Sequence, residues 1–171
     1  MESPRALEKL AQAVATCDAT GHRLCFELLC LDDVTSQALL VSSSVPFTLS
    51  TNKYPTLRDV WGAGAPGMVS GTGSILCIAM VMDQWSTVEW LLWKQPNPNS
   101  TLQGAQGETC VFTTPLHICV RSGIAVAYDT VAPALVRMGA AIHARDSMGS
   151  TPRDVLEPVR DTHTELAAMF E

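Results

Sequence analysis

The chain has 171 residues, of which 47% are hydrophobic and 16% are charged, and its formal net charge is −6 at pH 7. This length fits one domain with a substantial core. The acidic balance, with only 11 lysines and arginines together, argues against a surface that follows nucleic-acid phosphates, so we expect no nucleic-acid partner.

Residues 1–31 have the pattern of two helices joined by a turn. Ser3-Pro4 provides a cap followed by a proline at the first helical position. Apolar residues then recur at helical spacing, at Leu7, Leu10, Ala11 and Val14. After a turn at residues 18–21, a second apolar run covers residues 24–31.

The same segment bears on the compartment. Residues 1–10 carry charges of both signs without an apolar run that suits a signal peptide, and no later run reaches membrane-spanning length. We therefore expect a soluble intracellular protein without a membrane partner, cytoplasmic with the nucleus as the alternative. The six cysteines are then expected to be reduced and to act as small hydrophobic residues.

Residues 32–72 show no helical repeat pattern. Residues 41–51 have β-branched and hydroxyl side chains in loose alternation, and residues 61–67 are rich in glycine and proline. We expect a long irregular insertion that packs on the body through Phe47, Tyr54, Leu57 and Trp61. Long loops of this kind are either functional or disordered, and the sequence leaves both readings open.

Residues 73–113 again predict two helices. Ser74 is the expected N-cap of the first, with Leu76 and Ala79 on its buried face. The second is expected over residues 87–94. The glycine-containing, polar stretch of residues 97–113 is expected to be an enlarged finger loop.

Residues 114–152 carry the clearest pattern. Thr114 is the expected N-cap of a helix with Pro115 at its first position. A second apolar segment, residues 131–138, ends at Gly139, which suits a positive φ. The polar residues 143–150 predict a tight turn that leads to a second Thr-Pro at residues 151–152.

This segment resembles the ankyrin-repeat family. Thr114-Pro115-Leu116-His117 matches the family's signature tetrapeptide, and residues 139–152 follow its glycine–alanine, finger and re-entry pattern. The resemblance implies that His117 is structural and ties neighbouring hairpins together. The spacing from Thr114 to Thr151 is 151 − 114 = 37 residues, against about 33 in ordinary repeats, which suggests extra residues within 124–130.

The resemblance implies an all-α fold, an ankyrin-repeat solenoid of about four helix-turn-helix units with hairpin fingers and one long irregular insertion. As one domain, the chain would then divide into an N-terminal capping unit, the insertion, two repeats and a C-terminal capping unit, at residues 1–31, 32–72, 73–113, 114–150 and 151–171.

The resemblance also implies a function, protein–protein recognition by a monomer through the concave helix face and the finger tips. The partner would be another protein, neutral or basic where it meets this acidic chain. The candidate partner-binding residues follow from repeat register and are Met82, Asp83, Arg121, Ser122, Arg145, Asp146, Ser147 and Met148.

The alternative is a small-molecule-binding protein or a small enzyme of the isomerase or cyclase kind, working by shape and acid–base groups. Its pocket would lie between residues 32–72 and the solenoid. The candidate lining residues are Trp61, Trp85, Trp90, Trp93, His22 and His117. Enzymatic activity is left open, with His22, His117 or Asp83 as the acid–base candidates.

The sequence does not support a metal or a cofactor. Cys17, His22, Cys25 and Cys30 are close in sequence, but Cys25 and Cys30 are five residues apart on an expected helix and diverge, and no Cys-x2-Cys turn is present. Serine-hydrolase and phosphate-loop motifs are also absent from the sequence. We therefore assign no metal site, no cofactor and no catalytic residue.

Overall fold

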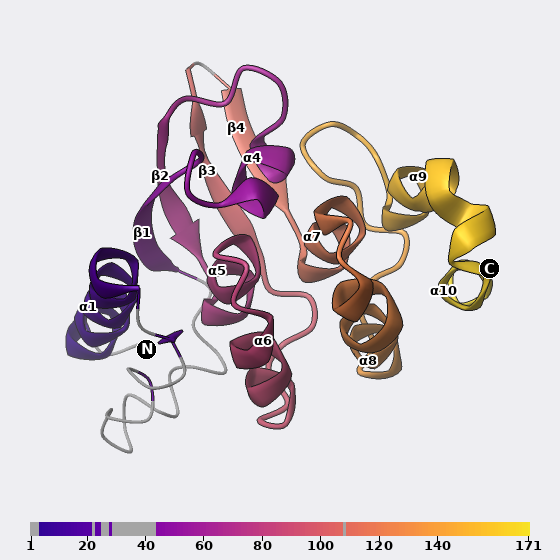
Figure 1. Cartoon of the computed structure of the whole chain (residues 1–171), viewed down its shortest axis with the longest axis horizontal. Coiled ribbons are helices and arrows are strands. Elements are labelled where there is room, and N and C mark those ends of the chain that lie inside the picture. The colour runs from indigo at the N-terminus through magenta and orange to yellow at the C-terminus, as the bar shows by residue number, and fades with distance from the viewer. Residues whose placement is uncertain (1–3, 22, 25–27, 29–43, 108) are drawn as a thin grey trace.

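The computed structural model describes residues 4–21, 23–24, 28, 44–107 and 109–171. The chain extends along the long axis from α1 (Pro4–Thr20) at one end to α10 (Thr164–Ala168) at the other (Figure 1). The predicted second helix of residues 24–31 falls largely outside the described residues, as do residues 32–43 of the predicted insertion.

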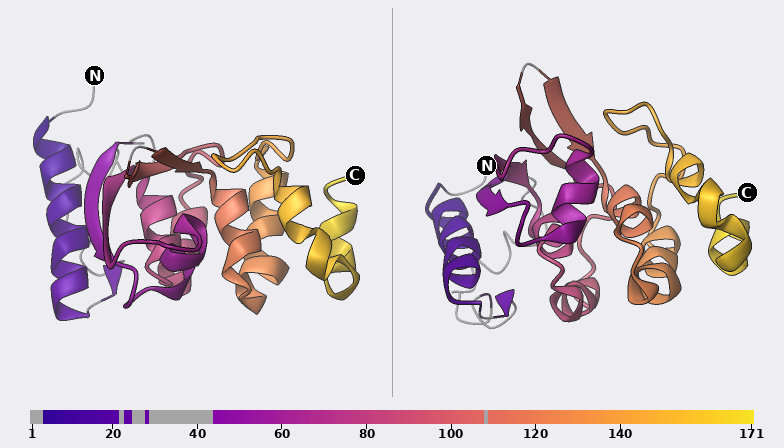
Figure 2. Two further views of the ribbon diagram at one scale, coloured as in Figure 1. Left: turned by 90° about the horizontal axis from the view of Figure 1, so that it is seen from above. Right: turned by 45° about the horizontal axis from the view of Figure 1, so that its top comes forward.

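A four-stranded antiparallel sheet is built from residues 45–113, with the strand order β1-β2-β3-β4. The strands are β1 (Val45–Ser50), β2 (Met68–Gly73), β3 (Leu102–Gln106) and β4 (Thr109–Thr113). β1 buries every second side chain, Val45, Phe47 and Leu49, as a strand with one covered face does. Helix α1 packs beside β1 at the edge of the sheet (Figures 1 and 2).

The prediction of an all-α repeat solenoid with an irregular insertion is therefore wrong, and the fold is mixed α/β. Within the predicted irregular segment, residues 45–50 form the strand β1. It pairs with β2 over six residues, although α4 (Pro55–Trp61) separates the two strands in the chain. The enlarged finger is the β3–β4 hairpin, which continues the same sheet. These pairings join segments that are distant in the sequence, so a local periodic pattern cannot predict them.

Two strand glycines explain why this region looks irregular in sequence. A Cβ atom at Gly71 would lie 2.1 Å from the backbone oxygen of Gln103, and one at Gly104 would lie 2.7 Å from the ring of Trp61. Glycine in a strand often marks such a close approach. At these two positions glycine permits β2 to approach β3 and permits α4 to cover the sheet.

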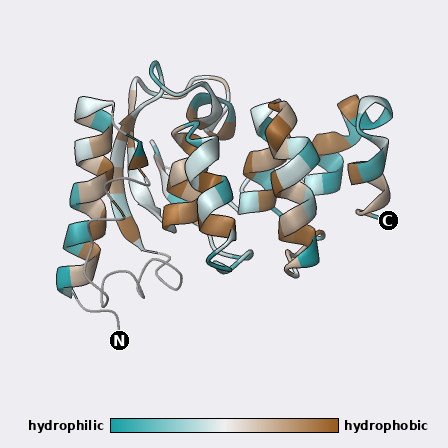
Figure 3. Cartoon of the chain, turned by 60° about the horizontal axis from the view of Figure 1, so that its bottom comes forward, coloured by the Kyte–Doolittle hydropathy of each residue, from teal (hydrophilic) through white to brown (hydrophobic). Residues whose placement is uncertain are grey.

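The remaining elements form pairs of short helices beside the sheet (Figure 1). They are α5 (Ile75–Val81), α6 (Trp85–Leu92), α7 (Pro115–Ser122), the π-helical turn η1 (Ala127–Val131), α8 (Ala132–Arg137), α9 (Pro152–Leu156) and the 3-10 helix η2 (Glu157–Thr162). All seven residues of α5 are buried, because α4, α6 and α7 pack around it. Hydrophobic and hydrophilic residues both occur along the other helices (Figure 3), as is typical of helices that pack one face on the core.

Several local predictions for the helices are confirmed. The Ser74 hydroxyl accepts a hydrogen bond from the amide of Cys77 at 3.2 Å, and Gly139 has a φ of 91°. At Thr114 the predicted cap bond is wrong, because its hydroxyl contacts His117 Nδ1 at 2.8 Å and caps no amide. The extra residues predicted within 124–130 overlap η1, a wider helical turn that leads into α8.

No helix in the described ranges combines the length and the apolar character that a membrane span requires.

Candidate functional site

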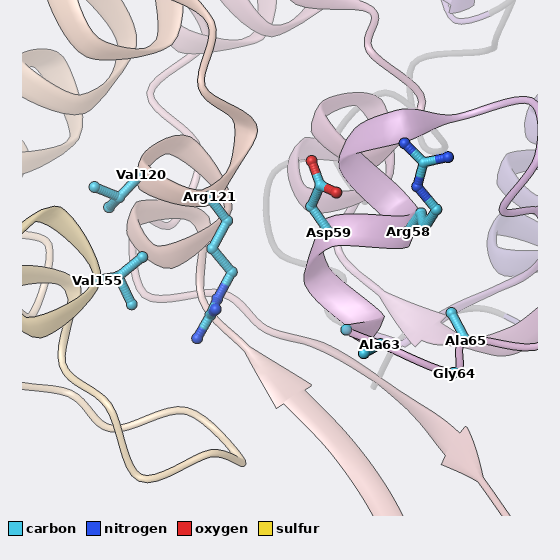
Figure 4. A pocket seen from close by; sticks show the side chains of 9 residues that line it. Arg58, Asp59, Ala63, Gly64, Ala65, Val120, Arg121 and Val155 are labelled. Carbon is cyan, nitrogen blue, oxygen red and sulfur yellow. The ribbon is translucent and has the colours of Figure 1, made fainter. Parts of the chain in front are cut away.

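A cleft of about 560 Å³ lies between α4 with the loop that follows it on one side and α7 with α9 on the other (Figure 4). Arg58, Asp59 and the loop of residues 62–65 form the first wall. Val120 and Arg121 of α7 and Val155 of α9 form the second wall. The cleft therefore joins the sheet-covering helix α4 to the C-terminal helix pairs.

Contacts at both ends of α4 fix the position of the first wall. The carboxylate of Asp83 accepts hydrogen bonds from the amide and the hydroxyl of Thr56, in the first turn of α4. At the other end of the helix, Trp61 is buried and meets the ring of Phe47 edge-on, with the centroids 6.2 Å apart. Both ends of α4 are thus tied to neighbouring elements, which holds the wall in place.

The loop after α4 presents small side chains and backbone to the cleft. Gly62 and Gly64 have φ values of 82° and 85°, which L-residues with a Cβ rarely adopt. The amide of Ala65 closes the turn on the Gly62 oxygen at 3.1 Å. An occupant of the cleft could approach this backbone closely, because no long side chain of residues 62–65 stands in the way.

In the second wall, Arg121 is held by the buried carboxylate of Asp146, which belongs to the neighbouring turn. Asp146 Oδ2 accepts a hydrogen bond from the Arg121 guanidinium, and its Oδ1 accepts from the amides of Met148 at 2.9 Å and Ser150 at 3.0 Å. The amide of Ser147 donates to the Phe112 oxygen of β4 at 3.0 Å. The turn of residues 145–150 is therefore fixed to both α7 and the sheet.

Met148 projects from this fixed turn toward the first wall. Its side chain is 53% exposed, and its Cε lies 3.2 Å from the place that a Cβ at Gly62 would occupy. A flexible thioether suits irregular and apolar contacts. Met148 thus forms an apolar rim at the mouth of the cleft.

His117 lies beneath the turn of residues 145–150 and is hydrogen-bonded to it. It is fully buried, with Nε2 at 2.8 Å from the Ser150 oxygen and Nδ1 at 2.8 Å from the Thr114 hydroxyl. Since a carbonyl oxygen only accepts, Nε2 carries the proton and Nδ1 accepts from Thr114. Burial lowers the pKa of His117 below its ordinary value, so the ring is neutral and structural.

The predicted partner-binding residues separate into two groups. Arg121 lines the cleft. Asp146, Ser147 and Met148 belong to the turn that is bonded to Arg121, and Arg145 lies in the same turn with its guanidinium on the Gly149 oxygen. The other three make internal contacts instead. Met82 is 3% exposed, Asp83 holds α4, and the Ser122 hydroxyl donates to the Cys119 oxygen at 2.8 Å at the end of α7.

The predicted pocket residues are not brought into this cleft. Trp61, Trp85 and His117 are buried, Trp90 is half-buried beneath Lys94, and Trp93 is 87% exposed. His22 lies outside the described residues. A cleft does lie between part of residues 32–72 and the helices, as the pocket hypothesis expected, but other residues line it.

Sequence reasoning missed Arg58, Asp59, Val120, Val155 and the wall made by residues 62–65. The glycine-rich run after Trp61 was the available signal, because glycines with positive φ allow a compact turn with exposed backbone. The glycine-rich run forms a wall of the cleft only because α7 and α9 lie opposite it. The sequence does not show this arrangement, because α7 and α9 are far from residues 62–65 in the chain.

The charges of the cleft have both signs. Arg121 and Asp59 stand on opposite walls, and Arg58 points away from α7 (Figure 4). Within the described ranges, Asp59 has no ion-pair or hydrogen-bond partner, and no group of three or more His, Cys, Asp or Glu side chains is placed to hold a metal. Cys17 is buried, and the three other residues of the cluster at 17–30 are not described.

Comparison of the chain with family models, curated proteins and solved structures gave no significant match. The resemblance of residues 114–152 to ankyrin repeats therefore stays a prediction, and the function is argued from the geometry of the cleft.

Proposed function

We propose that this chain is a protein–protein recognition module that binds its partner over the cleft between α4 and α7, with the turn of residues 145–150 at the rim. The observation that carries this proposal is the set of bonds around Asp146. One buried carboxylate accepts from a guanidinium and from two backbone amides of the exposed turn. Such a turn is ordered before any partner arrives.

Because the turn is already ordered in the free chain, it loses little conformational entropy when a partner binds. The unfavourable contribution of this entropy to the binding free energy is therefore small. Hydrogen bonds to a charged group contribute roughly 1.5–3 kcal/mol each, so they hold the turn against fraying. Met148 is then displayed at 53% exposure on a fixed backbone. An apolar side chain on a fixed backbone, next to a concave wall, suits a contact that a partner buries completely.

The partner's contacting segment is expected to combine an apolar side chain with a basic one. The apolar group would pack on Met148, Val120 and Val155 at the cleft. The carboxylate of Asp59 would attract the basic group, and the net charge of −6 favours the approach of a basic surface.

The proposal is tested by native mass spectrometry of the purified chain after incubation in an extract of its source cells. We expect a mass gain of tens of kilodaltons that Met148→Glu and Ala63→Glu abolish, because both place a charge at the mouth of the cleft. Met68→Glu is the matched control, since Met68 is 54% exposed on β2 and lies outside the cleft lining. Retention of the complex in Met148→Glu, or its equal loss in Met68→Glu, would contradict the proposed surface.

A small-molecule-binding protein is the second candidate. The cleft volume of about 560 Å³ lies within the range of ligand pockets, roughly 300–1,000 Å³. A mass gain of a few hundred daltons that Ala63→Glu removes and Met68→Glu preserves would favour this candidate over a protein partner.

A further inference from the structure

A second concave surface lies on the other side of the helix pairs. Trp93 directly follows α6 and lines a groove of about 400 Å³, together with Glu89, Leu92 and Gln95 and with Thr130 and Ala134 from the neighbouring η1 and α8. In Figure 1, α6 and α8 lie on the side of α5 and α7 that is away from the β3–β4 hairpin and the turn of residues 145–150. The groove is therefore separate from the cleft.

Trp93 is not needed for the core. Trp85, Thr87, Val88 and Leu91 are the buried residues of α6, whereas Trp93 is 87% exposed. Large aromatic side chains contribute most when they are buried, and exposed ones often mark interaction sites. Gln95, in the same groove, has a φ of 53°, a backbone conformation that non-glycine residues rarely adopt.

The groove has the chemistry of a cation site. Glu89 precedes Trp93 by four residues, so both side chains lie on the same face of the helix. The carboxylate and the indole π-face both attract a positive charge. Within the described ranges Glu89 has no ion-pair partner, and the nearby Lys94 lies over Trp90, with its Nζ 5.7 Å from the ring centroid.

The remaining lining distinguishes arginine from lysine. The side chains of Gln95 and Thr130 add hydrogen-bond acceptors at the groove, and Leu92 with Ala134 adds apolar surface for a methylene chain. A guanidinium presents five donors in one plane and stacks on aromatic faces, which a compact ammonium does not. The acceptors and the ring together fit a guanidinium better.

We propose that the groove at Trp93 binds an arginine side chain presented by a partner protein. Glu89 supplies the charge and Trp93 the stacking face. The site is independent of the cleft between α4 and α7, so either proposal can fail while the other stands.

The test uses two synthetic peptides of the same length that differ at one position, arginine in one and the neutral isostere citrulline in the other, flanked by glycine and serine. Each is titrated into the 15N-labelled chain, and the indole N–H signal of Trp93 is followed by NMR. We expect a saturable shift with the arginine peptide and a binding constant weaker by about threefold or more with the citrulline peptide.

Trp93→Leu and Glu89→Gln are each expected to weaken binding of the arginine peptide by about threefold or more. For Trp93→Leu the backbone amides of residues 89–95 replace the indole as the signal. Glu8→Gln is the charge-matched control, because Glu8 is exposed on α1 at the other end of the molecule. Both groove variants should unfold within about 0.5 kcal/mol of the native chain, since the changes are at the surface.

Four results would overturn the proposal. The first is no saturable shift with the arginine peptide, and the second is equal binding of the citrulline peptide. The third is an equal loss of binding in Glu8→Gln, which would show a general attraction to an acidic chain. Sedimentation that shows a dimer dissolved by Trp93→Leu would instead assign the groove to a second copy of the chain and would also overturn the proposal.

Discussion

At the scale of single residues, His117 and Asp146 hold the same turn from two sides. His117 donates through Nε2 to the Ser150 oxygen, while Asp146 accepts the Ser150 amide. Both side chains are buried. Breaking either hydrogen bond is therefore costly, because water cannot readily replace the lost partner. The turn that carries Met148 thus depends on one neutral imidazole and on the carboxylate that pairs with Arg121.

We predict that stability falls as the solution is acidified from about pH 7.5 to about pH 5.5, through the ordinary pKa of histidine. Burial lowers the pKa of His117 in the folded chain below 6.5. The unfolded chain therefore binds the proton first, and the free energy of unfolding decreases as pH falls, by at most about 1.4 kcal/mol per pH unit. Urea unfolding at several pH values measures this slope.

His117→Gln should flatten that slope, although it also lowers stability at every pH because the two ring hydrogen bonds change. Asp18 and Asp154 have lowered pKa values as well, but their contribution is lost only near and below their ordinary value of 3.8. An unchanged slope in His117→Gln would show that another group is responsible.

At the scale of elements, the glycines of β2 and β3 decide whether the sheet can form. A Cβ at Gly71 would overlap the Gln103 backbone oxygen at 2.1 Å, whereas a Cβ at Gly67, just before β2, would meet only Asn52 Nδ2 at 3.9 Å. The two positions are four residues apart and have opposite environments. They form a matched pair for testing the pairing of β2 with β3.

We predict that Gly71→Ala lowers the free energy of unfolding by about 3 kcal/mol or more, because backbone atoms rather than a flexible side chain must move. Gly67→Ala should stay within about 0.5 kcal/mol of the native chain. Chemical denaturation of both variants measures the difference. Equal stability of the two would rule out the register in which Gly71 lies opposite Gly104.

The strands were only partly predictable. The alternation in β1 is visible in Val45, Phe47 and Leu49, but β2 has glycine at 71 and 73 and lacks a clear period. The helices were better predicted, since caps such as Ser74 and C-terminal glycines such as Gly123, with a φ of 66°, act within a few residues. Of the predicted partner-binding residues, Arg121 lines the cleft and residues 145–148 lie in the turn bonded to it. The opposite wall was not predicted, and partner binding by any of these residues stays a prediction.

At the scale of the whole molecule, α5 is the centre of the core. All seven of its residues are buried, and α4, α6 and α7 pack around it. The C-terminal end is different, because α10 is five residues long and only Leu166 and Ala167 are buried in it. The extent of burial determines the free energy at which each region opens locally, without unfolding of the whole molecule.

We predict that the amides of α5 exchange with deuterium only by global unfolding, whereas those of α10 exchange through local opening. The free energies from exchange of α5 should equal the value from denaturant unfolding, and those of α10 should be lower by about 2 kcal/mol or more. Native-state hydrogen exchange followed by NMR measures both. Protection of α5 below the global value would mean that the core is divided into separate units.

The sequence by itself determined the helices of residues 75–92 and 115–137, the cap at Ser74 and a tight turn within residues 143–150. These features depend on contacts between near neighbours or on a recognisable local pattern. Only the tertiary structure decided the sheet and the cleft. The hydrogen bond between Gln103 and Thr72 joins residues 31 positions apart, and the cleft needs α4 to stand opposite α7. Such contacts depend on side-chain burial and on glycines that allow strands to approach closely. A periodic pattern along the sequence therefore cannot predict them.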